Sequence, residues 1–341
     1  MSDFRIGVSS DFYSEARGSL EEVLAGQALD GVEVHPLPCG TCATAEALNQ
    51  FDAVFALALR ITTESLQGVD RLAIVARWGV GYDLIDVDAL TDAGIVLSIT
   101  PNAVRRPVAE AILTLMLALA KNLFQQDRVA RAGGWRGDLA GMGISLSGRV
   151  LGSVGCGNIA QELFRLVRPI GFRRLLACDP YVNAQQVRDL GVELVDMNTV
   201  FAESDFVCVN TYLSAATRGL IGEEQFRLMK AGAYFINTAR GPIVQHDALV
   251  RALREKWIAG AGIDVFPVEP PPRNEPLFEM ENVIVAPHAL AWTDVLMRDN
   301  GREAFQNVLA VSRGKLPGGI VNRGVTGKEA FQKKLARWSA G

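Results

Sequence analysis

The chain has 341 residues, which is enough for two domains of ordinary size. Hydrophobic residues make up 49% of it and charged residues 21%, as in a globular protein with an ample core. The formal net charge of −4 gives no electrostatic reason to expect a nucleic acid or an anionic membrane as a partner.

Three features indicate where the protein works. The N-terminal residues lack the apolar core of a signal peptide, and the longest apolar run, residues 111–120, is too short to span a bilayer. The five cysteines are an odd number, and their scattered positions favour a reducing compartment over a disulfide framework. We therefore expect a cytoplasmic protein.

Residues 4–100 alternate short apolar runs with helical stretches. The expected strands are 5–8, 31–34, 52–56, 72–75 and 95–98. The expected helices are 14–25, 44–49, 62–66 and 86–93. This alternation predicts a parallel sheet covered on both faces, without a phosphate-binding turn.

Two motifs in this part have more than one interpretation. Cys39 and Cys42 have the spacing of a redox pair or of half a zinc site, but no second pair of ligands lies at metal-binding spacing. We expect two ordinary loop cysteines and no bound metal. The turn at 79–81 ends a strand, where its N–H groups could bind an anion, although a plain tight turn explains it equally well.

The next stretch predicts a crossing between two α/β units. Pro101 and Pro107 bracket a short segment, and residues 108–122 form a long apolar helix that we expect to be buried between domains or subunits. The stretch 128–137 is too irregular for a core element, and we expect it to be an arm that packs on a partner chain.

The strongest pattern follows the apolar run 150–154. This run leads into Gly155-Cys-Gly157, helical periodicity follows, and a second apolar run ends at Asp179. Strand, glycine turn, helix, strand and acid is the order of a dinucleotide-binding βαβ unit. Gly155 permits the tight turn, and Gly157 lets a pyrophosphate approach the backbone at the N-terminus of the helix.

The acid at the end of the second strand predicts the cofactor. The Asp179 carboxylate can accept hydrogen bonds from the ribose hydroxyls of NAD, whereas the 2′-phosphate of NADP would bring a like charge beside it. Arg173 and Arg174 precede the strand and should project from its opposite end. NAD is therefore the expected cofactor.

The rest of the chain continues the alternation. The expected strands are 206–210, 233–237, 259–264 and 283–286, and the expected helices are 222–230, 245–256 and 292–313. Residues 314–341 look like a polar tail, and the basic run 328–337 within it looks like a solvated helix face.

Three side chains that could carry chemistry follow predicted strands. Arg240, Glu269 and His288 each come shortly after the carboxyl end of a strand, where α/β folds place their sites. Reduction of a 2-oxo acid by a nicotinamide cofactor needs such a set: a cation for the carboxylate and carbonyl oxygen, a proton donor, and a carboxylate beside that donor. The other two histidines have no such context, so we expect His35 to be structural and His246 to lie on the surface.

Several of these motifs together resemble those of the D-isomer-specific 2-hydroxyacid dehydrogenases. The motifs are 79–86, 155–160, 210–213 with 216–221, 237–241, 262–266 with Glu269-Pro270, and Pro287-His288. The resemblance extends from about Arg5 to Asn322. It implies hydride transfer between NAD and a small D-2-hydroxy acid or 2-oxo acid of the glyoxylate, hydroxypyruvate or phosphoglycerate kind.

The resemblance also implies an architecture. A flavodoxin-like substrate-binding domain would comprise residues 1–103 and 291–341, and a Rossmann NAD-binding domain would comprise residues 104–290. The active site would lie in the cleft between these two doubly wound parallel-sheet domains. A homodimer would form through the helix after Pro107 and the arm that carries Trp135.

The same resemblance assigns roles to individual residues. Arg240 matches the substrate-binding arginine, His288 the acid/base and Glu269 its partner. Val80 and Gly81 match the backbone that holds the substrate carboxylate. The matching cofactor contacts are Gly155, Gly157, Asn158, Ile159, Asp179, Thr211, Thr217, Thr238 and Asp264.

Some residues depart from the family pattern and concern the substrate more than the reaction. They are Trp78, Arg105, Arg106, Asn210 and the segment Ala289–Trp292. Arg105 and Arg106 could meet the far end of an acidic or phosphorylated substrate, or simply form a solvated basic turn.

Two other functions use the same fold. Formate dehydrogenases pair the histidine with a glutamine, so Glu269 argues against that activity. A non-catalytic, NAD-sensing corepressor can keep all three catalytic residues, and the motifs alone leave that alternative open.

Overall fold

The structure is a computed structural model, and it describes residues 4–9, 25 and 31–338. The chain divides into two compact units: unit 1 comprises residues 1–104 and 292–341, and unit 2 comprises residues 105–291. Each boundary lies one residue later than the resemblance implied. Both units are parallel α/β sheets, which confirms the predicted fold class.

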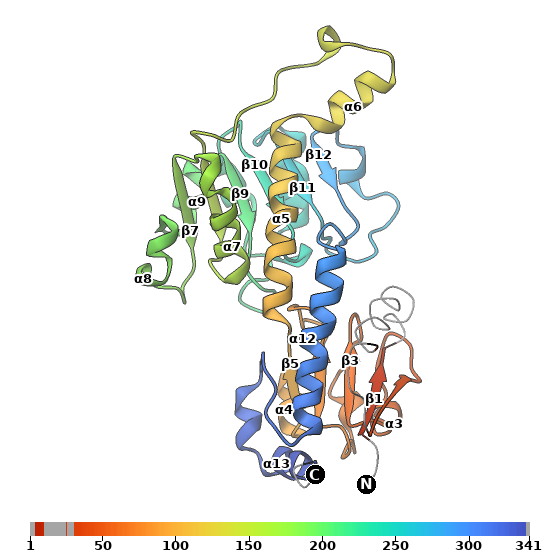
Figure 1. Cartoon of the computed structure of the whole chain (residues 1–341). Helices are drawn as coiled ribbons and strands as arrows, with labels where there is room; N and C mark the ends of the chain where they lie inside the picture. Colours follow the sequence, from red (N-terminus) through yellow and green to blue (C-terminus); the bar gives the residue numbers. More distant parts are fainter. Residues whose placement is uncertain (1–3, 10–24, 26–30, 339–341) are drawn as a thin grey trace. The chain divides into compact units, whose positions relative to one another are not determined.

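Unit 1 contains five parallel strands in the order β2-β1-β3-β4-β5 (Figure 1). They are β1 (Phe4–Val8), β2 (Val32–Pro36), β3 (Ala53–Ala56), β4 (Ile74–Arg77) and β5 (Val96–Ser98). This is the strand order of flavodoxin-like domains. All five strands were predicted, because each is a short apolar run bounded by turn residues.

Helices cover both faces of this sheet. Short helices α3 (Ala45–Leu48) and α4 (Val87–Asp92) pack on one face, around Val54 and Leu97. The long helix α12 (Asp294–Ser312) packs on the other face, around Phe55. The predicted helix 62–66 is a 3-10 turn at Glu64–Leu66, and the predicted helix 14–25 lies outside the described residues apart from Ala25.

Unit 2 contains seven parallel strands in the order β12-β11-β10-β9-β6-β7-β8. They are β6 (Val150–Val154), β7 (Arg174–Cys178), β8 (Val192–Leu194), β9 (Phe206–Val209), β10 (Tyr234–Asn237), β11 (Gly260–Ile263) and β12 (Val283–Val285). The chain runs from β6 to β7 on one side and returns to β9 on the other. The strand order therefore reverses between β6 and β9, where this type of fold binds its ligands.

Two layers of helices bury the faces of this second sheet. Helices α5 (Pro101–Ala120) and α7 (Asn158–Val167) cover one face. Helices α9 (Met197–Glu203), α10 (Glu223–Leu228) and α11 (His246–Arg254) cover the other. The remaining short elements are α8 (Ala184–Val187), η2 (Arg136–Asp138), η3 (Arg168–Ile170), η4 (Arg188–Leu190), η5 (Gly241–Ile243) and η6 (Pro276–Glu279).

The expected start of the long helix after the crossing segment is wrong. Helix α5 begins at Pro101 and includes Pro107, so residues 102–106 are helical. The Glu303 carboxylate accepts hydrogen bonds from the backbone N–H groups of Asn102 and Ala103, at 3.2 and 3.0 Å, and thereby caps the first turn. The apolar side of α5 packs on the sheet of unit 2, and its burial between domains or subunits stays a prediction.

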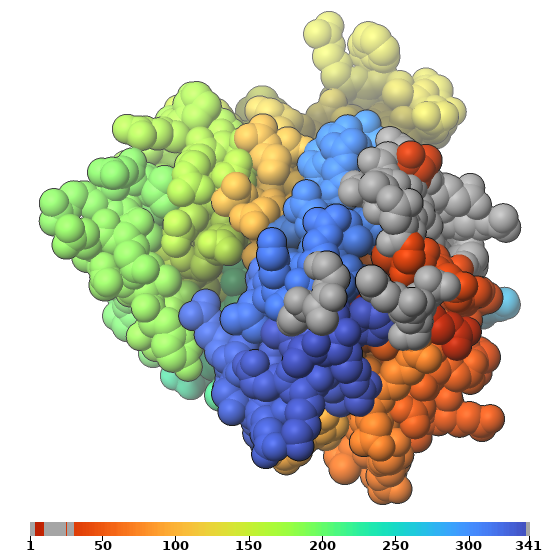
Figure 2. Space-filling model, turned by 60° about the horizontal axis from the view of Figure 1, so that its bottom comes forward, coloured from red at the N-terminus to blue at the C-terminus, as the bar shows by residue number. Residues whose placement is uncertain are grey.

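The C-terminal residues are not a polar tail. They form a 3-10 helix, η7 (Arg323–Gly327), and the helix α13 (Glu329–Ala336), which lies beside α12 in unit 1 (Figures 1 and 2). Phe331 is fully buried and Leu335 nearly so. The basic run therefore has one buried side that docks on the core of unit 1.

Helix α6 (Leu123–Arg131) and the segment after it extend away from the sheet of unit 2 (Figure 1). None of the residues of α6 is buried. Within the described part of the chain, no single helix is long and apolar enough to cross a membrane. Helices α5 and α6 meet the combined requirement of length and apolar composition only as a pair, and they are bent by 57° relative to each other.

Candidate active site

The predicted site residues of unit 2 gather at one edge of its sheet. All seven strands are parallel, so their carboxyl ends lie at the same edge. The residues that follow these ends are Gly155 after β6, Asp179 after β7, Thr211 after β9, Thr238 and Arg240 after β10, Asp264 and Glu269 after β11, and His288 after β12. The candidate catalytic and cofactor residues of unit 2 therefore lie along a common edge, as their places after the predicted strands indicated.

The turn after β6 fits the pyrophosphate of a dinucleotide. Gly155 has φ +97°, and a Cβ there would lie 2.5 Å from the carbonyl oxygen of Asn210, so only glycine is accommodated. A Cβ on Gly157 would instead point into open space. Gly157 is also the N-cap of α7 and offers no side chain to the first N–H groups, which belong to Asn158 and Ile159. These free donors and the positive end of the helix dipole suit a phosphate.

Asp179 is anchored beside this turn. One carboxylate oxygen accepts from the N–H of Cys156 and the other from the N–H of Tyr181, both at 2.8 Å. Each oxygen retains a second lone pair that can accept from a ribose hydroxyl. Arg174 is the first residue of β7 and therefore lies at the end of the strand opposite Asp179, as predicted. It pairs with Glu193 and Glu203.

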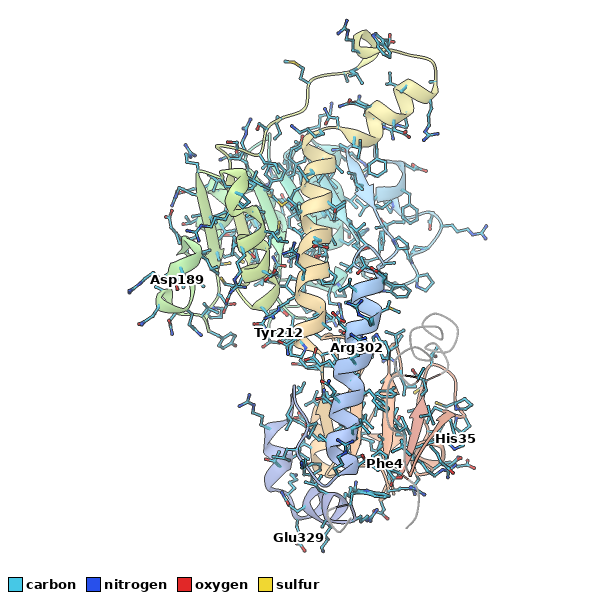
Figure 3. The ribbon with its side chains drawn as sticks, viewed as in Figure 1. Phe4, His35, Asp189, Tyr212, Arg302 and Glu329 are labelled. Atoms are coloured by element: carbon cyan, nitrogen blue, oxygen red, sulfur yellow. The ribbon has the colours of Figure 1, made fainter. Side chains whose placement is uncertain are left out.

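The loop after β9 is held by its own polar side chains. The Asn210 amide donates to Ser153 Oγ at 2.9 Å, which fixes this loop to β6. Thr217 Oγ1 accepts from the N–H of Ser214 and donates to the carbonyl of Tyr212, so it closes the loop on itself. Tyr212, labelled in Figure 3, has an exposed side chain. The cofactor roles of Thr211 and Thr217 remain predictions.

Asn237 shapes the turn that carries Arg240. Its amide donates to the Arg240 carbonyl at 3.0 Å, and its Oδ1 accepts from the Ala239 N–H at 3.0 Å. The Arg240 guanidinium is partly buried and donates to the Ala239 carbonyl at 2.7 Å. This role of Asn237 could not be predicted from the sequence, because the hydrogen bond that its side chain donates and the one that it accepts exist only once the turn has formed.

His288 and Glu269 form a direct pair. His288 Nδ1 lies 2.7 Å from Glu269 Oε2, and the other carboxylate oxygen accepts from the Phe266 N–H at 3.0 Å. Burial raises the pKa of the Glu269 carboxyl, but its hydrogen bond with His288 and the positive charges of His288 and Arg240 outweigh this and hold the pKa below its ordinary value. Glu269 is therefore an ionised partner for the His288 imidazole.

The backbone at His288 has an unusual conformation, and hydrogen bonds hold the residues that follow it. His288 has φ 54°, in the left-handed region that non-glycine residues rarely adopt and that often marks functional sites. Immediately after it, the N–H groups of Ala289 and Leu290 donate to Asp264 Oδ1 at 3.2 and 3.3 Å. Burial raises the pKa of the Asp264 carboxyl above its ordinary value. Asp264 thus supports the histidine turn, and its cofactor contact remains a prediction.

Val80 and Gly81 belong to unit 1, in the loop after β4. Both are partly exposed, and their N–H groups donate to no acceptor in the described part of the chain. Trp78, just before them, is buried in the core of unit 1, where its ring meets Phe55 edge to face. The departure at Trp78 is therefore explained by packing.

Arg105 and Arg106 are not equivalent. Both lie in helix α5, so the basic-turn interpretation is wrong. Arg106 pairs with Glu110 at 2.6 Å and with Glu162 at 3.4 Å, and these carboxylates already balance its charge. Arg105 is exposed on the same helix.

The other two histidines, His35 and His246, lie in different surroundings. His35 lies on β2 (Figure 3) and its Nε2 contacts Glu33 at 3.1 Å, in keeping with a structural role. His246 is not a surface residue as expected. Its Nε2 lies 3.0 Å from Glu275, whose side chain is buried, and the pair joins the start of α11 to the loop that follows β11.

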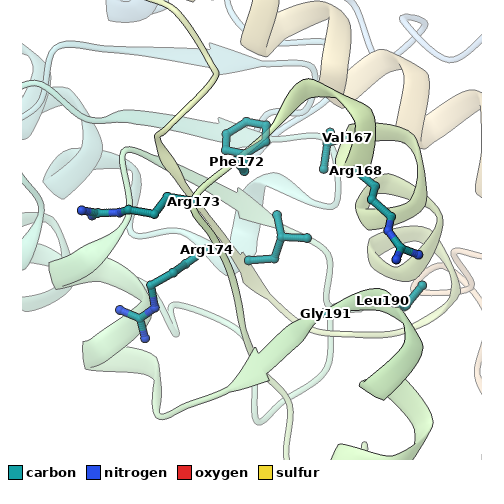
Figure 4. A pocket seen from close by; sticks show the side chains of 8 residues that line it. Val167, Arg168, Phe172, Arg173, Arg174, Leu190 and Gly191 are labelled. Carbon is teal, nitrogen blue, oxygen red and sulfur yellow. The ribbon is translucent and has the colours of Figure 1, made fainter.

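A depression lies at the amino end of β7, opposite the edge that carries the candidate active site (Figure 4). It has a volume of about 190 Å³ and is lined by Val167, Arg168, Phe172, Arg173, Arg174, Leu175, Leu190 and Gly191. Arg174 is paired with two carboxylates, and Arg168 donates to the Asp189 carbonyl. This depression is separate from the cofactor turn, which lies at the carboxyl end of the same sheet.

The fold and this edge of the sheet define a class of protein. A glycine turn and an acid suited to a dinucleotide lie at the same sheet edge as an arginine and a histidine–glutamate pair. That combination is typical of a nicotinamide-dependent oxidoreductase.

Comparisons with known proteins identify the family. A family model described as the D-isomer specific 2-hydroxyacid dehydrogenase, NAD binding domain, matches residues 113–289. A glyoxylate reductase of Korarchaeum cryptofilum is 37% identical over 82% of this chain and 85% of its own length. A glyoxylate reductase of Aeropyrum pernix is 34% identical over 94% of this chain and 96% of its own length. A solved glyoxylate reductase from Paecilomyes thermophila is 26% identical, with a TM-score of 0.80 over 95% of this chain and 99% of that one.

The chain therefore belongs to the D-isomer-specific 2-hydroxyacid dehydrogenase family. It is an NAD-dependent oxidoreductase that acts on a small 2-hydroxy acid or the corresponding 2-oxo acid. These relatives lend no support to the corepressor alternative.

Proposed function

We propose that the protein reduces glyoxylate or a closely similar short 2-oxo acid, with His288, Glu269 and Arg240 as its catalytic residues. The observation that carries this proposal is the 2.7 Å contact between His288 Nδ1 and Glu269 Oε2 at the carboxyl edge of the NAD-binding sheet. The names of the relatives support the choice of substrate, since several of them are glyoxylate reductases.

The proton transfer follows from that contact. Because Nδ1 faces the carboxylate, Nε2 is the nitrogen left to donate a proton to the carbonyl oxygen of the substrate. Ionised Glu269 stabilises the imidazolium before the transfer. When bound, NADH supplies the hydride that the carbonyl carbon accepts. One hydride and one proton together convert the 2-oxo acid to the 2-hydroxy acid.

Arg240 would orient the substrate. A planar guanidinium can contact a carboxylate oxygen and the neighbouring carbonyl oxygen together, and it polarises the carbonyl as negative charge develops on its oxygen. Asn237 supports this role by holding the Arg240 backbone. We assign the substrate carboxylate to the N–H groups of Val80 and Gly81 on the strength of the family resemblance.

The cofactor assignments follow the same sheet edge. Gly155 and Gly157 would face the pyrophosphate, and the N–H groups of Asn158 and Ile159 would bind it. Asp179 would accept from the ribose hydroxyls, and Thr211, Thr217, Thr238 and Asp264 would line the remaining length of NAD.

A homodimer is also proposed. The arm formed by α6 and residues 132–145 exposes large apolar side chains, namely Leu123, Phe124, Trp135 and Met142. Trp135 is 74% exposed and Met142 is 96% exposed, which favours burial against a second copy.

A cytoplasmic location is supported by the cysteines, all five of which are free thiols.

The direct test of the substrate is a panel of 2-oxo acids with NADH, followed by the loss of reduced-nicotinamide absorbance. The panel contains glyoxylate, hydroxypyruvate, a phosphorylated acid and a longer-chain acid. We expect the largest kcat/KM with glyoxylate or hydroxypyruvate. Turnover with the longer or phosphorylated acid alone would contradict the proposed substrate, and no turnover with any acid would contradict the proposed chemistry.

A further inference from the structure

We propose that Thr100 and Asn300 are positioning residues for the substrate carboxylate. They hold the loop Gly79-Val80-Gly81 so that the N–H groups of Val80 and Gly81 are presented to an anion. This inference rests on the proposed function, because it takes the 2-oxo acid as the anion that the loop binds. All the residues involved belong to unit 1.

Thr100 holds Gly79 from both sides. Its Oγ1 accepts from the Gly79 N–H at 2.8 Å, and its own backbone N–H donates to the Gly79 carbonyl at 3.0 Å. Both residues are buried, and Thr100 has no exposed surface. A buried residue that satisfies both polar groups of one loop residue fixes that residue more firmly than either bond alone.

The two bonds determine where the Val80 N–H points. The carbonyl of Gly79 and the N–H of Val80 belong to one planar trans peptide, in which they point in opposite directions. Because the carbonyl is bound to the Thr100 N–H, the Val80 N–H must point away from Thr100. Loss of the hydrogen bonds between Thr100 and Gly79 would let this peptide rotate, and the Val80 N–H would then point in another direction.

Arg77 holds two further carbonyls, one before and one within the loop. Its Nε donates to the Gly81 carbonyl at 2.6 Å, and its Nη1 donates to the Trp78 carbonyl. The carbonyls of Trp78 and Gly81 are thus turned toward Arg77. Gly79 has φ +121°, and a Cβ there would lie 3.2 Å from the Arg77 guanidinium, so this arrangement requires glycine.

Asn300 determines how Thr100 uses its hydroxyl. Asn300 Oδ1 lies 2.6 Å from Thr100 Oγ1 and is itself only 4% exposed. Since the Asn300 oxygen can only accept, the Thr100 hydroxyl donates to it and keeps its lone pairs for the Gly79 N–H. Helix α12 therefore acts on the loop through one defined hydrogen-bond chain, from Asn300 through Thr100 to Gly79.

The test compares Thr100→Val and Thr100→Ser with the unmodified protein. Valine keeps the shape but removes the hydroxyl, whereas serine restores it. We expect Thr100→Val to raise KM for glyoxylate roughly tenfold or more and to weaken binding of oxamate, an unreactive 2-oxo acid analogue, to the same degree. The Kd for NADH should stay within about twofold, and Thr100→Ser should restore glyoxylate binding.

A matched control is Thr91→Val. Thr91 also lies in unit 1 and also has an asparagine partner, since its Oγ1 accepts from Asn322 at 3.0 Å, but it does not contact the loop. Thr91→Val should leave both KM and the NADH Kd unchanged. If Thr100→Val does not fold, Asn300→Leu replaces it, because that change removes the acceptor of the Thr100 hydroxyl.

The possible outcomes distinguish failure of this inference from failure of the proposed function. An unmodified protein that reduces 2-oxo acids, together with a Thr100→Val protein of unchanged KM, would overturn the inference alone. Equal losses of glyoxylate and NADH binding would also overturn it, since they would mean general damage. An unmodified protein that reduces no 2-oxo acid would overturn the proposed function and this inference with it.

Discussion

At the residue scale, His288 is the side chain to which we assign the proton transfer. It contacts an ionised carboxylate through Nδ1, and the Asp264 carboxylate holds the two residues that follow it. These contacts orient a single imidazole at the carboxyl end of β12. The role of the histidine can therefore be separated from the folding of the sheet.

His288→Ala should lower kcat by roughly 10²–10⁴-fold, because a positioned acid is lost while the cofactor turn is untouched. The Kd for NADH, measured by fluorescence titration, should remain nearly unchanged. His35→Ala is the matched control, since His35 is also paired with a glutamate but lies on β2 of unit 1. A His288→Ala protein with near-normal kcat would remove His288 from the mechanism.

Asp179 should set the preference for NAD. A 2′-phosphate about 5 Å from its carboxylate would be repelled by roughly 3 kcal/mol at an effective dielectric of 20, before salt screening. The unmodified enzyme should therefore favour NAD over NADP by about a hundredfold in kcat/KM.

Asp179→Asn should narrow that ratio. The asparagine keeps an oxygen for the Cys156 or Tyr181 N–H, so it removes the charge with less damage to the turn than alanine would cause. The comparison is kcat/KM for the two cofactors in each protein. Equal use of NAD and NADP by the unmodified enzyme would mean that Asp179 does not lie at the ribose.

At the element scale, helix α13 is attached to unit 1 by a buried lysine. Lys334 is 5% exposed, and its Nζ donates to the Ala93 carbonyl at the end of α4 at 2.8 Å. Burial lowers the pKa of Lys334 to about 8 from its ordinary value of 10.5. Below pH 8 the folded protein must therefore hold a partly desolvated charge that the unfolded chain keeps in water.

The sign of the pH effect follows from this depressed pKa. Between about pH 8 and pH 10.5 the unfolded chain binds more protons at Lys334 than the folded one, so the free energy of unfolding rises with pH in this window. The contribution is at most about 3 kcal/mol. Lys334→Met should remove this rise, as measured by urea unfolding at a series of pH values.

The neighbouring residue supplies the control for this measurement. Lys333 is exposed and pairs with Glu329 on the same helix, so Lys333→Met should keep the pH dependence of the unmodified protein. An identical pH dependence in the Lys334→Met protein would show that Lys334 is not the titrating group.

The elements also show what the sequence could predict and what it could not. The strands of both sheets and the residues after them were predictable, because apolar runs and turn residues are local signals and the ends of parallel strands share an edge. The start of α5 was missed, because the carboxylate that caps it belongs to Glu303, far along the chain. The same holds for the His246–Glu275 pair and for the link from Asn300 to Thr100. Hydrogen bonds between distant segments leave no periodicity to detect.

At the scale of the whole molecule, the exposed arm predicts self-association. The unmodified protein should be a dimer by light scattering, because Phe124 and Trp135 leave large apolar surfaces uncovered in the single chain. Changing both of them to glutamate should give a monomer. Leu316 of unit 1 lies outside the arm and is about as exposed as Phe124, so Leu316→Glu should leave the dimer intact. A monomeric unmodified protein would contradict the homodimer.

The configuration of the product gives the sharpest check that this NAD-dependent enzyme acts on D-2-hydroxy acids. The unmodified enzyme is supplied with hydroxypyruvate and NADH, and the glycerate that forms is resolved by chiral chromatography. A fixed arrangement of Arg240, His288 and the cofactor turn predicts that the hydride reaches a single face of the carbonyl, and membership of the D-isomer-specific family predicts that the product is D-glycerate alone. Formation of L-glycerate or of a racemic mixture would contradict the account.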